Sequence, residues 1–142
     1  MDCLFCKIAN HSIPADVIYE DERVLAFLDI HPIAPGHILV APKRHAENIL
    51  DLGKEDIGPI FEAVKKLTGV LNEAFNPQGF TIGINHGKVS GQAIDHLHVH
   101  IIPRFDEDGG GSLHSVVNNP PEMPLKEIKK KILEIINNGS IG

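Results

Sequence analysis

The stretch HLHVHIIPR, from His96 to Arg104, decides the fold that this sequence predicts. Histidine alternates with an apolar residue, and strict alternation is typical of a β-strand, whose successive side chains point to opposite faces. His96, His98 and His100 are therefore expected to share one face of that strand. A single exposed histidine is usually only a polar surface residue, but three in register indicate chemistry. Imidazole ionises near neutral pH, ligates metals and attacks phosphorus or carbonyl centres.

Apolar periodicity predicts the other elements of one sheet and its helices. Strands are expected at Val17–Tyr19, Val24–Leu28, His37–Pro42 and Gly79–Asn85, the first two as an antiparallel hairpin. Apolar residues at three- and four-residue steps predict a long amphipathic helix from about Lys54 to Phe75. A loop over 105–124 is acidic, then glycine-rich, then proline-rich, and a shorter helix follows over about 124–137.

Composition limits the class of protein. A chain of 142 residues is long enough for one domain with a buried core, expected over 1–142 with its core in 1–105. The net charge of −6 argues against broad nucleic-acid binding, although it allows a small nucleotide. No apolar run is long enough for a membrane span, and the first residues do not read as a signal peptide. We therefore expect a cytoplasmic protein without membrane or nucleic-acid partners.

Cys3 and Cys6 form a C-x2-C pair, whose spacing lets two thiolates meet one Zn²⁺. In the expected compartment a disulfide is disfavoured. The pair is only half of a zinc site and needs two more ligands, for which imidazoles are suited. Two buried, packed thiols are the alternative. A thioredoxin-like redox pair is less favoured, because no βαβ pattern surrounds the cysteines.

Other polar positions are ambiguous when taken alone. Asp29, at a strand end, suits either the two hydroxyls of a ribose or the capping of a turn, and the local sequence favours the turn. His37 opens the third predicted strand and His45 follows its end, and each alone is more often structural than catalytic. The glycine-containing loop from His86 to Asp95 leads into the three histidines and could turn backbone N–H groups towards an anion.

Several motifs together resemble the histidine triad superfamily. HLHVHIIPR is similar to its H-φ-H-φ-H-φ-φ motif, where φ is apolar. CLFCKI, FLDI at Phe27–Ile30, GHILVAPKRH at Gly36–His45 and N-x5-G-Q at Asn85–Gln92 follow the superfamily's order and spacing over roughly the first 105 residues. The chain is most similar to the bacterial and archaeal branch that resembles Hint-type nucleoside phosphoramidate hydrolases and diadenosine polyphosphate hydrolases.

The resemblance implies a fold and an assembly. The fold is α+β, a five-stranded antiparallel sheet with one long helix and one or two short ones. Members usually pair as symmetric dimers through the long helix and a neighbouring strand, so a homodimer is expected. The purine nucleotide substrate is implied in the same way, and no organic cofactor is expected.

The resemblance also gives the histidines their roles. His98 is the expected nucleophile, which attacks the α-phosphorus and forms a nucleotidyl-histidine. Water then attacks this intermediate and releases nucleoside monophosphate. His100 and the backbone around Gly91–Ala93 match the phosphate contacts, and His37 matches a supporting histidine behind the nucleophile. Asn85 and Gln92 match further site positions, Asp29 matches the ribose-binding carboxylate, and the apolar nucleoside pocket corresponds to Leu4, Ile8, Phe27 and Ile30.

Some branches of the superfamily bind a structural zinc ion, and the resemblance places its ligands at Cys3, Cys6, His45 and His96. Four protein ligands make a closed tetrahedral site, suited to structure rather than catalysis. In the alternative, His96 only orients a neighbouring group and the cysteines pack.

One departure from the family pattern bears on activity. Many members carry Ser or Thr after the G-Q, whereas this chain has Ala93, which removes a hydroxyl from the leaving group's surroundings. His100 favours a hydrolase, because nucleotidyl transferases of the superfamily have glutamine there. A nucleotide-binding regulatory or scaffold module with little turnover is the alternative function. A metal-storage or redox role is disfavoured, since it would leave the three histidines without a task.

Overall fold

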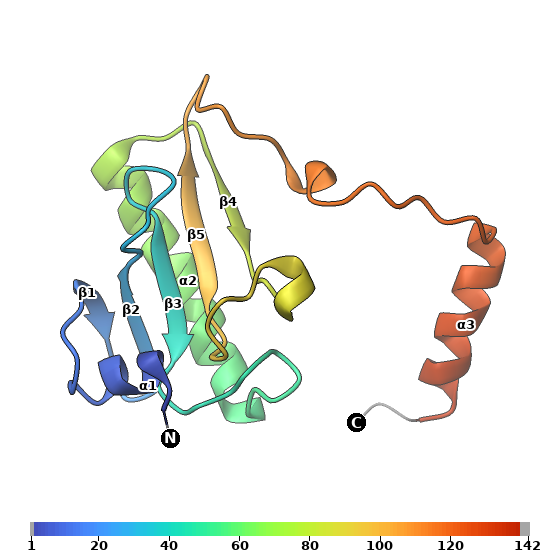
Figure 1. Cartoon of the computed structure of the whole chain (residues 1–142), viewed down its shortest axis with the longest axis horizontal. Coiled ribbons are helices and arrows are strands. Elements are labelled where there is room, and N and C mark those ends of the chain that lie inside the picture. Colours follow the sequence, from blue (N-terminus) through green and yellow to red (C-terminus); the bar gives the residue numbers. More distant parts are fainter. Residues whose placement is uncertain (1, 140–142) are drawn as a thin grey trace. The chain divides into compact units, whose positions relative to one another are not determined.

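The computed structural model describes residues 2–139 and confirms the predicted α+β fold. Five strands form one antiparallel sheet in the order β1-β2-β3-β5-β4 (Figure 1). The strands are β1 (Val17–Glu20), β2 (Val24–Leu28), β3 (Ile38–Pro42), β4 (Gly79–Gly83) and β5 (Val99–Arg104). The helices are α1 (Leu4–Ala9), α2 (Lys54–Phe75) and α3 (Leu125–Asn137), with short 3-10 turns η1 (Lys88–Ser90) and η2 (Leu113–Ser115).

The predicted strand boundaries need four corrections, the first of which extends β1 by one residue, from Tyr19 to Glu20. Strand β3 begins one residue after His37, and β4 ends at Gly83 rather than Asn85. Strand β5 begins at Val99, after His96 and His98, although the side chains before it continue its alternation. Helix α1 falls where no helix was placed, because six residues are too few for a clear period. Its N-terminus is capped by the Cys3 thiol, which accepts a hydrogen bond from the Cys6 N–H at 3.4 Å.

Helix α2 covers one face of the sheet and forms the larger core with it. Its residues Ile60, Val64, Leu67 and Leu71 pack against alternate residues of the central strands, among them Val40, Val99 and Ile101. Ile60, Val40 and Ile101 have no exposed surface, and burying one such side chain stabilises the fold by about 1.5–3 kcal/mol. The strand that carries the histidines is therefore fixed by its apolar residues.

Helix α1 covers part of the opposite face (Figure 1). Phe5 and Ile8 pack there with Leu25, Phe27 and Leu39, the strand residues that alternate with those of the α2 core. The Phe5 ring meets the His98 ring edge-on, with centroids 5.1 Å apart. The triad histidines therefore share one face of the sheet, as the alternation predicted, and this is the face that α1 partly covers.

The chain divides into two compact units, residues 1–109 and 110–142, the second described as far as residue 139. The sheet, α1 and α2 make up the first unit, whereas η2 and α3 belong to the second. The single domain expected over 1–142 stays a prediction. Within residues 2–139, no helix is both long and apolar enough to span a membrane.

Candidate functional site

The nucleophile predicted from the sequence, His98, lies just before β5 and is held by its own backbone. Its Nδ1 lies 2.7 Å from the carbonyl oxygen of His96, which can only accept a hydrogen bond. The Nδ1 atom therefore carries the proton, and Nε2 keeps its lone pair. The side chain is 8% exposed, so this lone pair stands in a largely desolvated environment. Such an imidazole can attack an electrophile without prior deprotonation.

His100 and His37 form a pair of histidines next to His98. The rings of His98 and His100 have centroids 5.0 Å apart, and His100 Nδ1 lies 2.9 Å from His37 Nε2. His37 thus contacts the third histidine of the triad. Asp29 places Oδ2 3.5 Å from His37 Nε2, while its Oδ1 accepts a hydrogen bond from the His31 N–H. Asp29 therefore caps its turn, as the local sequence favours, and its second carboxylate oxygen faces His37.

Burial favours the neutral forms of His37, His96 and His100. It lowers the pKa of His100 to about 4, an effect that the neighbouring His98 and His37 increase and Asp29 opposes. Burial also lowers the pKa of His37, again against Asp29, and the pKa of His96. His100 is thus uncharged at physiological pH, and it can act as a hydrogen-bond donor through one N–H rather than as a cation.

The low pKa of His100 predicts how stability depends on pH. Unfolding restores its pKa to about 6.5, so between pH about 6.5 and about 4 the unfolded chain binds the extra proton. The free energy of unfolding of the wild type should fall across this window by at most roughly 3 kcal/mol relative to His100→Gln, and level off below it. Urea titrations of both proteins measure the difference, and parallel pH profiles would contradict the prediction.

The loop before the triad is held from inside by Gln92. Its Oε1 accepts a hydrogen bond from the Gly87 N–H at 2.8 Å, and its Nε2 donates to the carbonyls of Glu47 and Ile94. Gln92 is buried, whereas Ala93 is exposed. Gly91 has a φ of +103°, and a Cβ there would lie 3.6 Å from the Asn85 amide nitrogen. Gln92 thus shapes the backbone that was expected to contact phosphate.

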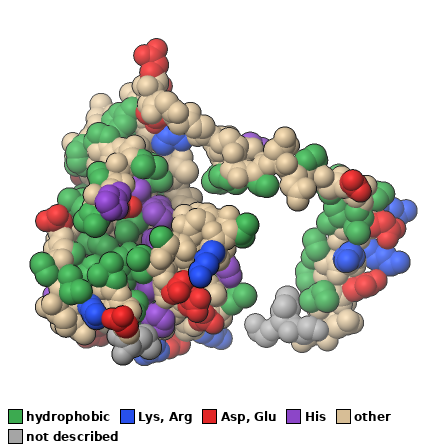
Figure 2. All heavy atoms as spheres, viewed as in Figure 1, with side chains coloured by type: hydrophobic (Ala, Val, Ile, Leu, Met, Phe, Trp, Pro, Cys, Tyr) green, Lys and Arg blue, Asp and Glu red, His purple; other side chains and the backbone are tan. Residues whose placement is uncertain are grey.

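The residues expected to form the nucleoside pocket divide into two groups. Ile8 and Phe27 are buried in the core under α1, with 6% and 4% exposure. Leu4 and Ile30 are exposed, at 41% and 78%. On the face shown in Figure 2, histidine side chains lie among hydrophobic ones. Of the four residues, Leu4 and Ile30 therefore present apolar side chains at the surface, whereas Ile8 and Phe27 belong to the core.

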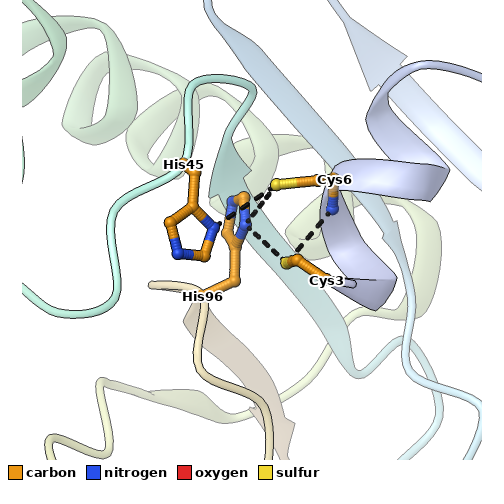
Figure 3. Close-up of side chains that lie close together, drawn as sticks. All are labelled: Cys3, Cys6, His45 and His96. Atoms are coloured by element: carbon orange, nitrogen blue, oxygen red, sulfur yellow. Dashed lines mark hydrogen bonds between the residues drawn. The ribbon is translucent and has the colours of Figure 1, made fainter. Parts of the chain in front are cut away.

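The four predicted metal ligands converge from three parts of the chain (Figure 3). Cys3 and Cys6 come from the start of α1, His45 from the loop after β3, and His96 from the segment before β5. His96 Nδ1 lies 3.3 Å from Cys3 Sγ and 3.5 Å from Cys6 Sγ, and His45 Nδ1 lies 3.4 Å from Cys6 Sγ. Sulfur and nitrogen ligands of tetrahedral Zn²⁺ stand about 3.6 Å apart, so these side chains could hold a metal ion.

Protonation in this cluster is also compatible with a metal. His96 Nε2 donates to the Pro42 carbonyl oxygen at 2.7 Å, which leaves Nδ1 unprotonated beside the thiols. Burial, with the hydrogen bond and charge of Cys3, raises the pKa of the Cys6 thiol to about 11. A metal would therefore have to displace the thiol proton on binding.

Sequence reasoning missed the backbone groups that hold the histidines. These are the carbonyls of Pro42 and His96 and the N–H of Ile33, which lies 3.2 Å from His37 Nδ1. A backbone group has no residue-type signature, so no signal in the sequence could have found them.

Comparison with known proteins agrees with this architecture. Residues 10–107 match the model of the HIT domain family. An uncharacterized HIT-like protein of Methanocaldococcus jannaschii is 45% identical over 128 residues, 89% of this chain and 98% of the relative. The adenosine 5'-monophosphoramidase hnt1 of Schizosaccharomyces pombe is 41% identical over 110 residues, 78% of this chain and 80% of its own.

Two further matches extend the comparison. The bis(5'-adenosyl)-triphosphatase of Dictyostelium discoideum is 32% identical over 124 residues, 85% of this chain and 83% of its own. A crystal structure of a HIT family protein from Bacillus anthracis matches with a TM-score of 0.87 and 38% identity, covering 99% of this chain and 98% of that one. With the triad strand, the antiparallel sheet and these matches in agreement, the chain belongs to the HIT, or histidine triad, family.

Proposed function

We propose that this protein is a nucleotide hydrolase that cleaves at the α-phosphate of nucleoside phosphoramidates or dinucleoside polyphosphates. The observation that carries the proposal is the His98 imidazole, whose Nδ1 is bound to the His96 carbonyl so that Nε2 presents a lone pair beside His100. The names of the fission-yeast phosphoramidase and the Dictyostelium triphosphatase support the same class of reaction.

The reaction would proceed in two displacements at phosphorus. In the first, the Nε2 lone pair of His98 forms a bond to the α-phosphorus, and the leaving amine or phosphate departs with the electrons of the broken bond and takes up a proton. In the second, water attacks the nucleotidyl-histidine, loses a proton and returns His98 to its neutral form. His100 and the backbone of Gly91–Ala93 would donate hydrogen bonds to the phosphoryl oxygens as charge develops.

The nucleoside would bind next to these groups. Asp29, 18% exposed through its side chain, would accept hydrogen bonds from the ribose hydroxyls. Leu4 and Ile30 would contact the base, with Ile8 and Phe27 beneath them. An apolar surface of this kind discriminates little between bases, so either purine should be accepted.

Cys3, Cys6, His45 and His96 would hold a structural Zn²⁺ ion. The ion would supply no chemistry to the reaction, because four protein ligands close its coordination sphere. It would tie α1 to the segment that precedes the nucleophile. Reduced thiols of this kind fit the cytoplasmic location expected from the sequence.

Release of nucleoside monophosphate from adenosine phosphoramidate and, separately, from diadenosine tetraphosphate tests the proposed function. Turnover of either substrate supports it, and the better substrate identifies the leaving group. If both substrates are inert while the protein still binds adenosine monophosphate, the hydrolase proposal fails. That result would favour the alternative function, a nucleotide-binding module with little turnover.

Ala93 is the feature that favours a nucleotide-binding module with little turnover. If the missing hydroxyl limits the rate, restoring it should increase activity. Restoring a hydroxyl with Ala93→Ser should add a hydrogen bond to the leaving group, worth about 1 kcal/mol and thus about fivefold in kcat. Because Ala93 is exposed, the serine should fit without repacking. Steady-state kinetics with Ala93→Gly as control measure the gain, and equal rates for all three proteins would contradict it.

We also propose that the protein is a homodimer. Strand β4 forms one edge of the sheet, and Ile82 on it is 39% exposed. Ile57, Phe61 and Phe75 share one side of α2 and are 44–48% exposed, which suits a self-complementary apolar contact.

The dimer predicts different outcomes for two substitutions on the same helix. Phe61→Glu should yield monomers, because it buries a charge in the contact. Val70→Glu is the matched control, since Val70 is 49% exposed and lies nine residues away, on the opposite side of α2. Sedimentation equilibrium measures both, and a monomeric wild type or a dimeric Phe61→Glu would contradict the proposal.

A further inference from the structure

The loop between β2 and β3 reaches the histidine pair through one backbone group. The Ile33 N–H donates a hydrogen bond to His37 Nδ1 at 3.2 Å. The loop is closed around this bond, because Asp29 N–H donates to the His37 carbonyl and His37 N–H donates to the Ala34 carbonyl. The Ile33 side chain is 74% exposed, so the residue meets the site through its backbone.

This hydrogen bond decides which nitrogen of His37 carries the proton. A neutral imidazole has one N–H, and Nδ1 must be the unprotonated nitrogen if it accepts from Ile33. The proton then lies on Nε2, which stands 2.9 Å from His100 Nδ1 and 3.5 Å from Asp29 Oδ2. The carboxylate favours the same tautomer, since it attracts a proton at Nε2.

The tautomer of His37 determines the tautomer of His100. Because His37 Nε2–H donates to His100 Nδ1, the His100 proton must lie on Nε2. His100 therefore presents an N–H, rather than a lone pair, at its free nitrogen. The reversed set of tautomers would turn that free nitrogen into an acceptor, which repels a phosphoryl oxygen.

We propose that the backbone amide of Ile33 is a positioning group that sets the tautomers of His37 and His100 and so makes His100 a hydrogen-bond donor to the phosphoryl group. The effect on rate rests on the proposed hydrolase function, whereas the tautomers can be measured without any activity. The residue acts through two rings and touches no substrate.

The same bond decides against a different use of these side chains. Ligand atoms of Asp29, His37 and His100 lie within 4.8 Å of one another and could in principle bind a metal ion. A metal on His37 Nε2 would force the proton onto Nδ1, where it would face the Ile33 N–H. Two N–H donors would then face each other. The Ile33 amide therefore favours the hydrogen bond from His37 Nε2–H to His100 Nδ1 over a metal at this position.

Replacing the Ile33 amide by an ester, with the α-hydroxy analogue of isoleucine introduced by nonsense suppression, removes this one N–H. We expect kcat to fall by on the order of 10- to 100-fold, with KM changed less than about twofold, because the donor acts as charge develops. In ¹⁵N spectra of the histidines at about pH 8, the wild type should show His37 and His100 protonated at Nε2, and the ester protein a shift towards Nδ1. Ile33→Ala, which keeps the amide, should match the wild type in both measurements.

Two results would overturn the proposal. One is a wild-type spectrum in which His37 or His100 is protonated at Nδ1, which needs no variant and no activity. The other is an ester protein whose tautomers and kcat equal those of the wild type. If the wild type hydrolyses neither substrate but shows the expected tautomers, the proposed function fails while the tautomer assignment stands.

Discussion

His98→Asn should lower the rate of nucleoside monophosphate release by on the order of a thousandfold or more, with either class of substrate. Asparagine keeps a polar side chain but has no nitrogen lone pair that can attack phosphorus. Hydrogen bonds from His100 and the backbone of Gly91–Ala93 would still bind the phosphate, so the affinity for adenosine monophosphate should change little. Stopped assays of product release and calorimetric binding measure the two effects separately.

The control for this loss is His114→Asn, the same substitution at an exposed histidine in the second compact unit. It should retain full activity. If His98→Asn keeps more than about a tenth of the wild-type rate, another group or water itself attacks the phosphorus. The covalent mechanism would then be wrong, even if the protein is a hydrolase.

The second large effect is expected on stability, from loss of the proposed zinc ion. Cys6→Ser or removal of the metal by chelation should lower the midpoint of thermal unfolding by on the order of 10 °C, because the ion ties α1 to the segment before β5. Without the ion, nothing would link the buried His96 to the two cysteines through a shared metal. Differential scanning calorimetry, with zinc added back after chelation, measures the loss and its reversal.

The metal content of freshly purified protein shows whether the four side chains hold a zinc ion. A value near one equivalent of zinc per chain supports the zinc site, and less than about 0.2 equivalents without chelator contradicts it. His114→Asn should again behave as the wild type, which separates loss of a ligand from loss of a histidine. An unchanged unfolding midpoint in Cys6→Ser would show that the cysteines only pack.

The sequence predicted the parts of the fold that depend on periodicity. The bounds expected for the long helix, about Lys54 to Phe75, agree with α2, because its apolar stripe is long and uninterrupted. The alternation of His98 and His100 with Val99 and Ile101 predicted opposite faces, and the structure places the apolar pair in the α2 core. Helix α1 was missed because its six residues are stabilised by packing of Phe5 and Ile8 and by a thiol cap rather than by a pattern.

The site was less predictable, since its geometry depends on contacts between distant segments. Spacing along the chain could not show that His37 bonds to His100, sixty-three residues away, or that the Gln92 amide is directed into its own loop. The resemblance supplied the residue types, whereas the tautomers follow from the carbonyl of His96 and the N–H of Ile33. Backbone groups of this kind become visible only once the chain is folded.

The stereochemistry at phosphorus tests the nucleotidyl-histidine mechanism directly. An adenosine phosphoramidate that carries a chiral phosphorothioate at the α-position is hydrolysed in ¹⁸O-labelled water, and the configuration of the product is determined. Attack by His98 followed by attack by water inverts the configuration at phosphorus twice, so we expect overall retention. Overall inversion would mean one direct displacement by water, and would contradict the nucleotidyl-histidine mechanism.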